Sequence, residues 1–123
     1  MPREKEDLIR LFHMYTSGRE AIDSAKGLTR RELETDRQLQ HTLIHCLQII
    51  GEAANKTSAE FKKAWPKVPW RELVRLRHHL VHVYFQVDLD VVWKSVTEDL
   101  PQMLPEIESM LVAKGMIQRE SGL

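Results

Sequence analysis

The residues best suited to chemistry lie close together between positions 77 and 84. Arg77 is followed five residues later by His82, and Tyr84 comes two residues after that. An arginine keeps its positive charge and can bind a phosphate through two parallel hydrogen bonds, whereas a histidine gains or loses a proton near neutral pH. Together these groups can cleave a phosphodiester without a metal ion, because one neutralises charge on the phosphate while the other transfers protons.

The segment that carries these residues, from 70 to about 83, is predicted to be helical. Each helical residue turns by about 100°, so Arg77 and His82 lie about 140° apart and flank one groove without touching. His78 lies between them and is one turn away from His82. Three histidines and an arginine fall within six residues, which favours a shared role over isolated solvated side chains. We assign His78 a supporting role.

A metal site is an alternative use of the histidines. His78 and His82 have the i,i+4 spacing of zinc-binding helices, and so do His41 and His45. However, the chain has no His-Glu-x-x-His pattern, and Arg77 would repel a nearby cation. We therefore expect no native metal and no cofactor, and keep a helical metal-binding protein as a third hypothesis.

Length and composition indicate one folded domain. The chain has 123 residues, of which 42% are hydrophobic and 29% charged, as is typical of a soluble globular protein. No apolar run approaches the roughly 18 residues that a membrane span requires, and the first residues are charged rather than signal-like. The single Cys46 cannot form an internal disulfide, which fits a reducing cytoplasm. Its apolar neighbours suggest a packed thiol.

Charge is balanced overall but unevenly distributed. The formal net charge is zero, so there is no global basic surface for nucleic acid. Residues 61–82 nevertheless hold six Lys or Arg and one acid, Glu72, while residues 88–108 hold six acids and only Lys94. The two stretches can be solvated faces that attract each other. Alternatively, the first forms a local positive surface that attracts a polyanion.

Apolar spacing predicts helices along nearly the whole chain, without hairpin signals. A first long helix is expected over about 4–25, ended by Gly27, and Thr29 with Glu32 has a capping-box pattern. A second long helix over about 36–56 has an apolar face wide enough for burial on two sides, the second side being another subunit in one interpretation. Gly51 in its middle suggests a close contact between helices.

The second half of the chain is divided by its prolines. A short helix over 61–65 precedes a connector with Pro66 and Pro69, and the basic helix follows. A turn is expected over 85–87, and Asp88 is a good N-cap for a final helix with a kink or restart near Pro101 and Pro105. We expect a helical domain over residues 1–114 and a frayed tail over 115–123.

Beyond its single motif, the sequence resembles the HepT-like toxin family of the HEPN superfamily. The similarity extends over roughly residues 8–111. It includes Gly27-Leu28-Thr29, the run Leu47-Gln48-Ile49-Ile50-Gly51-Glu52-Ala53-Ala54, Val68-Pro69-Trp70, Arg77-x4-His82-x-Tyr84, Val87-Asp88-Leu89, Val92-Trp93 and Glu98-Asp99-Leu100-Pro101. In two places the chain departs from the family pattern: His78 stands where Asn is usual, and Val83 where a small or polar residue is usual.

This resemblance implies an all-α, compact HEPN-type bundle of four to six helices that forms a homodimer, with two copies of the motif in one cleft. It also implies a metal-independent endoribonuclease toxin of a toxin–antitoxin pair. Arg77 would bind the scissile phosphate of an mRNA or tRNA, and His82 would transfer protons. The implied antitoxin is a minimal nucleotidyltransferase that can attach AMP to Tyr84, which would block the cleft by charge and bulk.

A non-catalytic function is the alternative. In this hypothesis the dimer serves only as a docking or nucleotide-binding partner of a minimal nucleotidyltransferase. The neutral net charge favours it, because phosphate contacts dominate affinity for nucleic acids.

Overall fold

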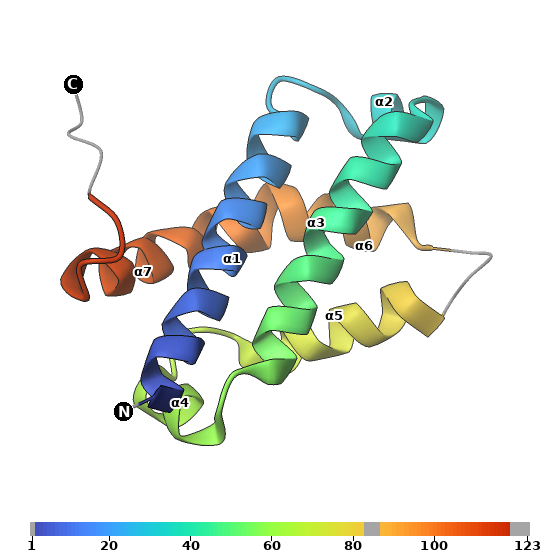
Figure 1. Cartoon of the computed structure of the whole chain (residues 1–123). Coiled ribbons are helices and arrows are strands. Elements are labelled where there is room, and N and C mark those ends of the chain that lie inside the picture. Colours follow the sequence, from blue (N-terminus) through green and yellow to red (C-terminus); the bar gives the residue numbers. More distant parts are fainter. Residues whose placement is uncertain (1, 83–86, 119–123) are drawn as a thin grey trace.

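The computed structural model describes residues 2–82 and 87–118, with the side chains of residues 2, 81 and 82 outside the described set. Its described elements are all helical, in agreement with the all-α prediction (Figure 1). They are α1 (Pro2–Ala25), α2 (Arg30–Thr35), α3 (Arg37–Lys56), α4 (Ala59–Ala64), α5 (Trp70–His82), α6 (Leu89–Lys94), a π-helical turn η1 (Ser95–Asp99) and α7 (Leu100–Ala113).

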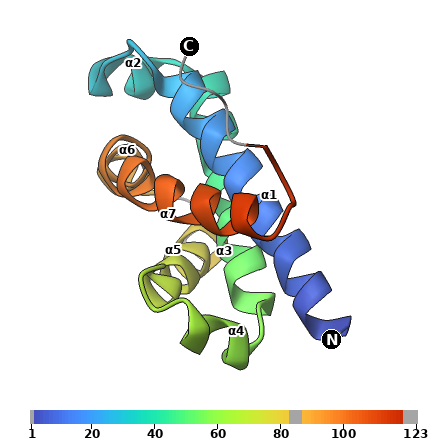
Figure 2. The same cartoon turned by 90° about the vertical axis from the view of Figure 1, so that its left-hand side faces the viewer.

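Helix α3 lies at the centre of the bundle. It packs along α1 on one side and against α5 on another, while α7 crosses α1 (Figures 1 and 2). Its wide apolar face is therefore covered within one chain by α1 and α5. Leu43, Leu47 and Ile50 of α3 are fully buried, together with Leu11 and Met14 of α1.

Local capping sets the helix starts much as the sequence predicts. Thr29 and Glu32 form the reciprocal capping box of α2, and Asp36 accepts a hydrogen bond from the Leu39 amide at the start of α3. Gly27 follows α1 with φ of 78°, a conformation that glycine adopts readily. Asp88 caps α6 by accepting from the amides of residues 90 and 91.

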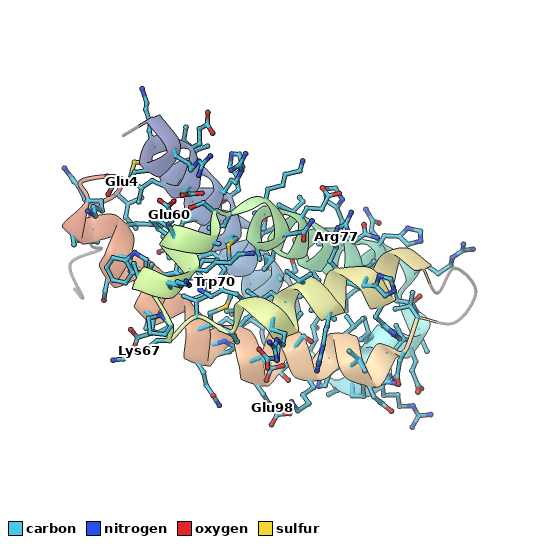
Figure 3. The ribbon with its side chains drawn as sticks, turned by 90° about the horizontal axis from the view of Figure 1, so that it is seen from below. Glu4, Glu60, Lys67, Trp70, Arg77 and Glu98 are labelled. Carbon is cyan, nitrogen blue, oxygen red and sulfur yellow. The ribbon has the colours of Figure 1, made fainter. Side chains whose placement is uncertain are left out.

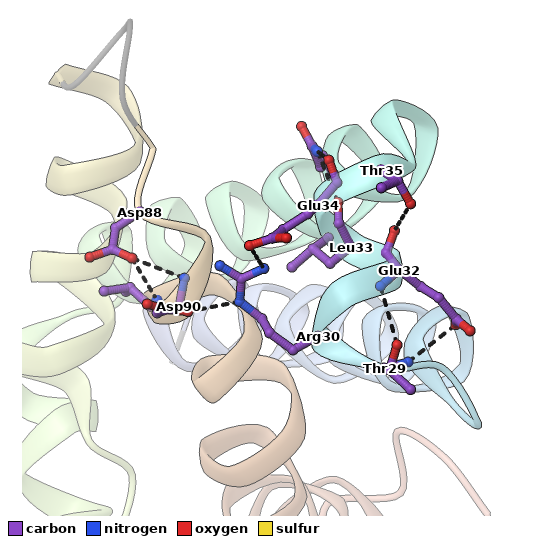
Figure 4. A network of polar contacts seen from close by, with 10 residues as sticks. Thr29, Arg30, Glu32, Leu33, Glu34, Thr35, Asp88 and Asp90 are labelled. Atoms are coloured by element: carbon purple, nitrogen blue, oxygen red, sulfur yellow. Dashed lines mark hydrogen bonds and ion pairs between the residues drawn. The ribbon is translucent and has the colours of Figure 1, made fainter.

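Two long-range polar contacts hold the short elements in place. The guanidinium of Arg30 donates to Asp90 at 2.8 Å, which ties α2 to the start of α6 (Figure 4). The buried carboxylate of Asp7 accepts from the backbone amide of Ser58 at 2.9 Å and from its hydroxyl at 2.6 Å. The second contact fixes the second turn of α1 against the N-terminus of α4.

The last helical stretch differs from the expectation. The backbone stays helical through Asp99 and Leu100, so the helix does not restart there, although α7 begins at Leu100 with Pro101 in its first turn and Pro105 lies inside it. The preceding residues, however, form the π-helical turn η1, which no sequence pattern indicated. Such a turn holds one extra residue and occurs often beside functional surfaces. Among the described residues, none of the helices is both long enough and apolar enough to cross a membrane.

Candidate functional site

Helix α5 carries the predicted motif, and its start is firmly anchored. The indole N–H of Trp70 donates to the carbonyl of Trp65 at 3.0 Å, and its ring meets Phe61 edge-on with centroids 6.3 Å apart. Val68, in the connector, is buried, as is Leu73 one turn into the helix. The connector therefore fixes both the direction and the rotation of α5, so that the positions of its later residues follow from helical geometry.

Arg77 lies at a close contact between α5 and α3. A Cβ atom added to Gly51 would lie 2.3 Å from the Cβ of Arg77 and 2.9 Å from the carbonyl oxygen of Leu73. No real side chain fits at such distances, so the crossing requires glycine in α3. The close helix contact that the sequence predicted for Gly51 is confirmed, and its partner is the motif arginine itself.

The guanidinium of Arg77 lies beside the carboxylate of Glu52 in α3. Its Nη2 lies 3.9 Å from Oε1 of Glu52, while its Nε is buried and has no hydrogen-bond partner among the described residues. The side chain is 30% exposed. Packing thus holds the base of the Arg77 side chain, and the Glu52 carboxylate attracts its guanidinium. Part of the side chain remains accessible to a ligand.

The other motif residues are only partly within reach of the structure. His78 is exposed on α5. His82 is the last residue of α5, but its side chain lies outside the described set, as do Val83 and Tyr84 entirely. The roles of Arg77 and His82 in catalysis, of His78 in support and of Tyr84 as AMP acceptor therefore stay predictions.

His79 is a residue that the motif reasoning did not single out. Its ring is half-buried, and its Nε2 is buried without a hydrogen-bond partner among the described residues. His79 lines a groove of about 760 Å³ between α5 and the α6–η1–α7 stretch. Leu76, Val91 and Met103 also line this groove. Helical spacing alone places His79 one position beyond His78 and away from the exposed side, so only knowledge of α7 reveals its environment.

The other candidates for a functional site are a metal-binding cluster and the thiol of Cys46. Within residues 2–82 and 87–118, no three side chains of the His, Cys, Asp or Glu type gather to hold a metal. Cys46 is buried, as expected, and its thiol donates to Glu20 at 3.3 Å. Burial, and secondarily this hydrogen bond to an acid, raises the pKa of the Cys46 thiol to about 12. At neutral pH it therefore remains a protonated, unreactive group.

The bundle and its arginine-bearing helix define a class of small all-α proteins with a polar site on one helix of a packed core. The chain belongs to the HepT-like ribonuclease family, since residues 9–110 match the family model described as "Ribonuclease HepT-like". This match supports a ribonuclease activity and confirms the resemblance seen in the motifs.

Curated relatives agree with this assignment. The chain is 39% identical over 95 residues to "Probable ribonuclease HepT" of Thermococcus cleftensis, covering 74% of this chain and 86% of the relative. It is 35% identical over 98 residues to "Putative RNase MJ1380" of Methanocaldococcus jannaschii, covering 80% of this chain and 90% of the relative. No solved structure gives a significant match.

Proposed function

We propose that the protein is a metal-independent endoribonuclease and the toxin of a toxin–antitoxin pair, acting in the cytoplasm on mRNA or tRNA. The observation that carries the proposal is the placement of Arg77. Its Cα and Cβ pack at the Gly51 crossing, its guanidinium lies beside Glu52 of α3, and the side chain is 30% exposed. A preorganised positive charge of this kind stabilises the charge that develops on a reacting phosphate.

The economical chemistry uses the nucleophile that RNA supplies. His82 takes the proton from a ribose 2′-hydroxyl, whose oxygen attacks the adjacent phosphorus while Arg77 neutralises the non-bridging oxygens. The bond to the 5′-oxygen breaks, and that oxygen leaves with a proton from a second acid. The products are a 2′,3′-cyclic phosphate and a 5′-hydroxyl. His78, exposed beside this pair, is positioned in the helical register to assist the proton transfers.

The active form in this proposal is a homodimer whose two motifs share a cleft. Its antitoxin is a minimal nucleotidyltransferase that transfers AMP to the Tyr84 hydroxyl, releasing pyrophosphate from ATP. The added phosphate would bring negative charge beside Arg77 and occupy the position of the substrate phosphate.

Cleavage of RNA in the presence of EDTA tests the catalytic part. Wild-type protein should cleave, and Arg77→Ala should reduce the rate by about 100- to 1,000-fold, as expected on losing a charge that stabilises the transition state. Arg77→Lys is the matched control that keeps the charge but loses the forked geometry, and it should retain a small part of the activity. Circular dichroism checks that each variant folds. Cleavage at the wild-type rate by both Arg77→Ala and His82→Ala would refute the mechanism.

Intact mass after co-expression with a minimal nucleotidyltransferase tests the partner. The protein should gain mass in whole AMP units, and Tyr84→Phe should gain none. A gain that persists in Tyr84→Phe would place the modification elsewhere.

The neutral net charge favours a second candidate, in which the dimer is only a docking or nucleotide-binding partner of the nucleotidyltransferase. Tight binding of that enzyme, with no turnover of any RNA, would favour this candidate over the nuclease.

A further inference from the structure

Three basic side chains before the motif lie exposed and unpaired. Lys67, in the connector, and Arg71 and Arg75, on α5, have no ion pair with any described residue. Several other cations are neutralised in the structure, for example Arg30 by Asp90 and Lys114 by Glu4. A cation left without an acidic partner keeps its full charge for a ligand.

Two of these cations lie on one side of α5, along a line that leads toward the motif. Arg71 and Arg75 are four residues apart on α5, and the same side of the helix continues through His78 to the register position of His82. Neighbours in this line are separated by about 6 Å or less along the helix axis. The opposite side of α5, which carries Leu73 and Leu80, is buried. In Figure 3, Lys67 lies near the beginning of α5 and Arg77 near the middle of this helix.

The line of cations borders the groove that contains His79. Lys67 and Arg75 both line this groove, whose apolar lining includes Leu76 and Val91, and Val91 is 37% exposed. The buried Nε2 of His79 lacks a partner among the described residues and offers one hydrogen-bonding group. The volume of the groove, about 760 Å³, is in the range that accommodates a small organic group.

We propose that Lys67, Arg71 and Arg75 bind the phosphates of single-stranded RNA along α5, and that an unstacked base enters the adjacent groove at His79. The combination of a cationic track with apolar contacts for bases is what single-stranded nucleic acids require, whereas a duplex keeps its bases stacked and paired. The inference rests on the proposed function, because that function requires RNA to reach the motif. The track delivers one side of the RNA to the motif end of α5, about 9 Å along the axis from Arg71 to Arg77.

One acidic residue on α5 tests whether RNA binding depends on the charge of this surface in the expected direction. Glu72 is exposed, lines the same groove and has no ion pair with a described residue. Its charge opposes phosphate binding at close range, so Glu72→Gln should tighten RNA binding by roughly twofold, whereas removing cations should weaken it.

The decisive experiment measures binding of a labelled RNA of about twelve nucleotides by fluorescence anisotropy. Arg77→Ala protein serves as background, so that cleavage does not interfere. Arg71→Gln/Arg75→Gln should weaken binding by about tenfold, and the slope of log affinity against log salt should become shallower by about 1.4, for two lost single-strand phosphate contacts. The matched control is Arg31→Gln/Arg37→Gln, which removes two exposed cations, at α2 and the start of α3, that have no ion pair with any described residue. It should bind nearly as the background protein does.

A second variant tests the groove. His79→Ala should weaken binding of single-stranded RNA by a fewfold while leaving the salt slope unchanged, because it removes a base contact and no charge. Thermal unfolding checks that each variant is folded. An unchanged affinity in Arg71→Gln/Arg75→Gln, or an equal loss in the control pair, would overturn the track. Preferential binding of a duplex of the same length would overturn its single-strand character.

Failure of this inference can be told apart from failure of the proposed function. A protein that binds RNA through the track but never cleaves it would refute the nuclease and leave the track standing. A protein that cleaves RNA but binds it equally well without Arg71 and Arg75 would do the reverse. If the same cations instead bind an acidic nucleotidyltransferase, Arg71→Gln/Arg75→Gln would weaken that complex and not RNA binding, which also overturns the inference.

Discussion

Two helix crossings in this bundle each contain a buried glycine inside a helix, and they are built differently. Gly51 of α3 faces the backbone of α5, since an added Cβ would meet the Leu73 carbonyl oxygen at 2.9 Å and the Arg77 Cβ at 2.3 Å. Gly18 of α1 faces only the side chain of Leu104 in α7, whose Cδ2 would lie 2.8 Å away. The first crossing is limited by main chain, and the second by the end of a flexible side chain.

The difference indicates where the fold tolerates little adjustment. A leucine side chain can change its rotamer, whereas backbone can move only if a whole helix shifts. The inflexible crossing is the one that carries Arg77, with Glu52 beside it. Precise placement of a charged group requires a rigid support, and the α3–α5 crossing provides one.

The largest effect is expected from substituting the two glycines. Gly51→Ala should lower the free energy of unfolding by about 2–3 kcal/mol, because overpacking of backbone outweighs the helix-propensity gain of up to about 1 kcal/mol. Gly18→Ala is the matched control and should change it by less than about 1 kcal/mol, since Leu104 can rearrange. Urea denaturation of both variants measures the difference.

Activity sharpens the same comparison. Folded Gly51→Ala should also cleave RNA more slowly than folded Gly18→Ala, because only the first displaces Arg77. Similar costs for the two substitutions would show that the α3–α5 crossing adjusts as easily as the other.

A smaller effect is expected from the carboxylate beside Arg77. Glu52→Gln should slow RNA cleavage by roughly threefold, since a partly exposed ion pair contributes at most about 1 kcal/mol to holding the guanidinium in place. The loss should appear in kcat and not in KM, because the neutral glutamine does not repel phosphate. Glu98→Gln is the control, as this exposed acid has no ion pair with a described residue. A KM increase with unchanged kcat would argue against a positioning role.

The last effect appears only at alkaline pH and concerns the other side of α3, where Cys46 faces Glu20 of α1. The raised pKa of the Cys46 thiol, about 12, means that the folded protein keeps this proton when the unfolded chain loses it near pH 9. Stability should therefore fall as the pH rises above 9, by about 1 kcal/mol at pH 10. Cys46→Ala should show a weaker decline over pH 8–10 in denaturation experiments. An identical decline would show that the thiol makes no contribution.

Most of the helices can be predicted from the sequence, whereas the candidate site can be predicted only in part. Helix starts at Thr29, Asp36 and Asp88 follow from side chains that cap the amides of their own first turn, so local patterns predict them. The Arg77 motif is visible from residue types and spacing. His79 and the η1 turn were not predicted. The surroundings of the half-buried His79 depend on how α5 packs beside α7, and no residue pattern in the sequence indicates the extra residue of η1.

The sequence by itself determined the helical class, the limits of most helices, the family and the residues that could perform the chemistry. The tertiary structure decided that Gly51 faces Arg77, that Glu52 adjoins its guanidinium, and that a groove lies beside the basic line on α5. The physical reason is range. Capping and apolar periodicity act within one or two turns of a single helix, whereas the contact between Gly51 and Arg77 depends on how two helices, joined through a short helix and a proline connector, pack against a common core.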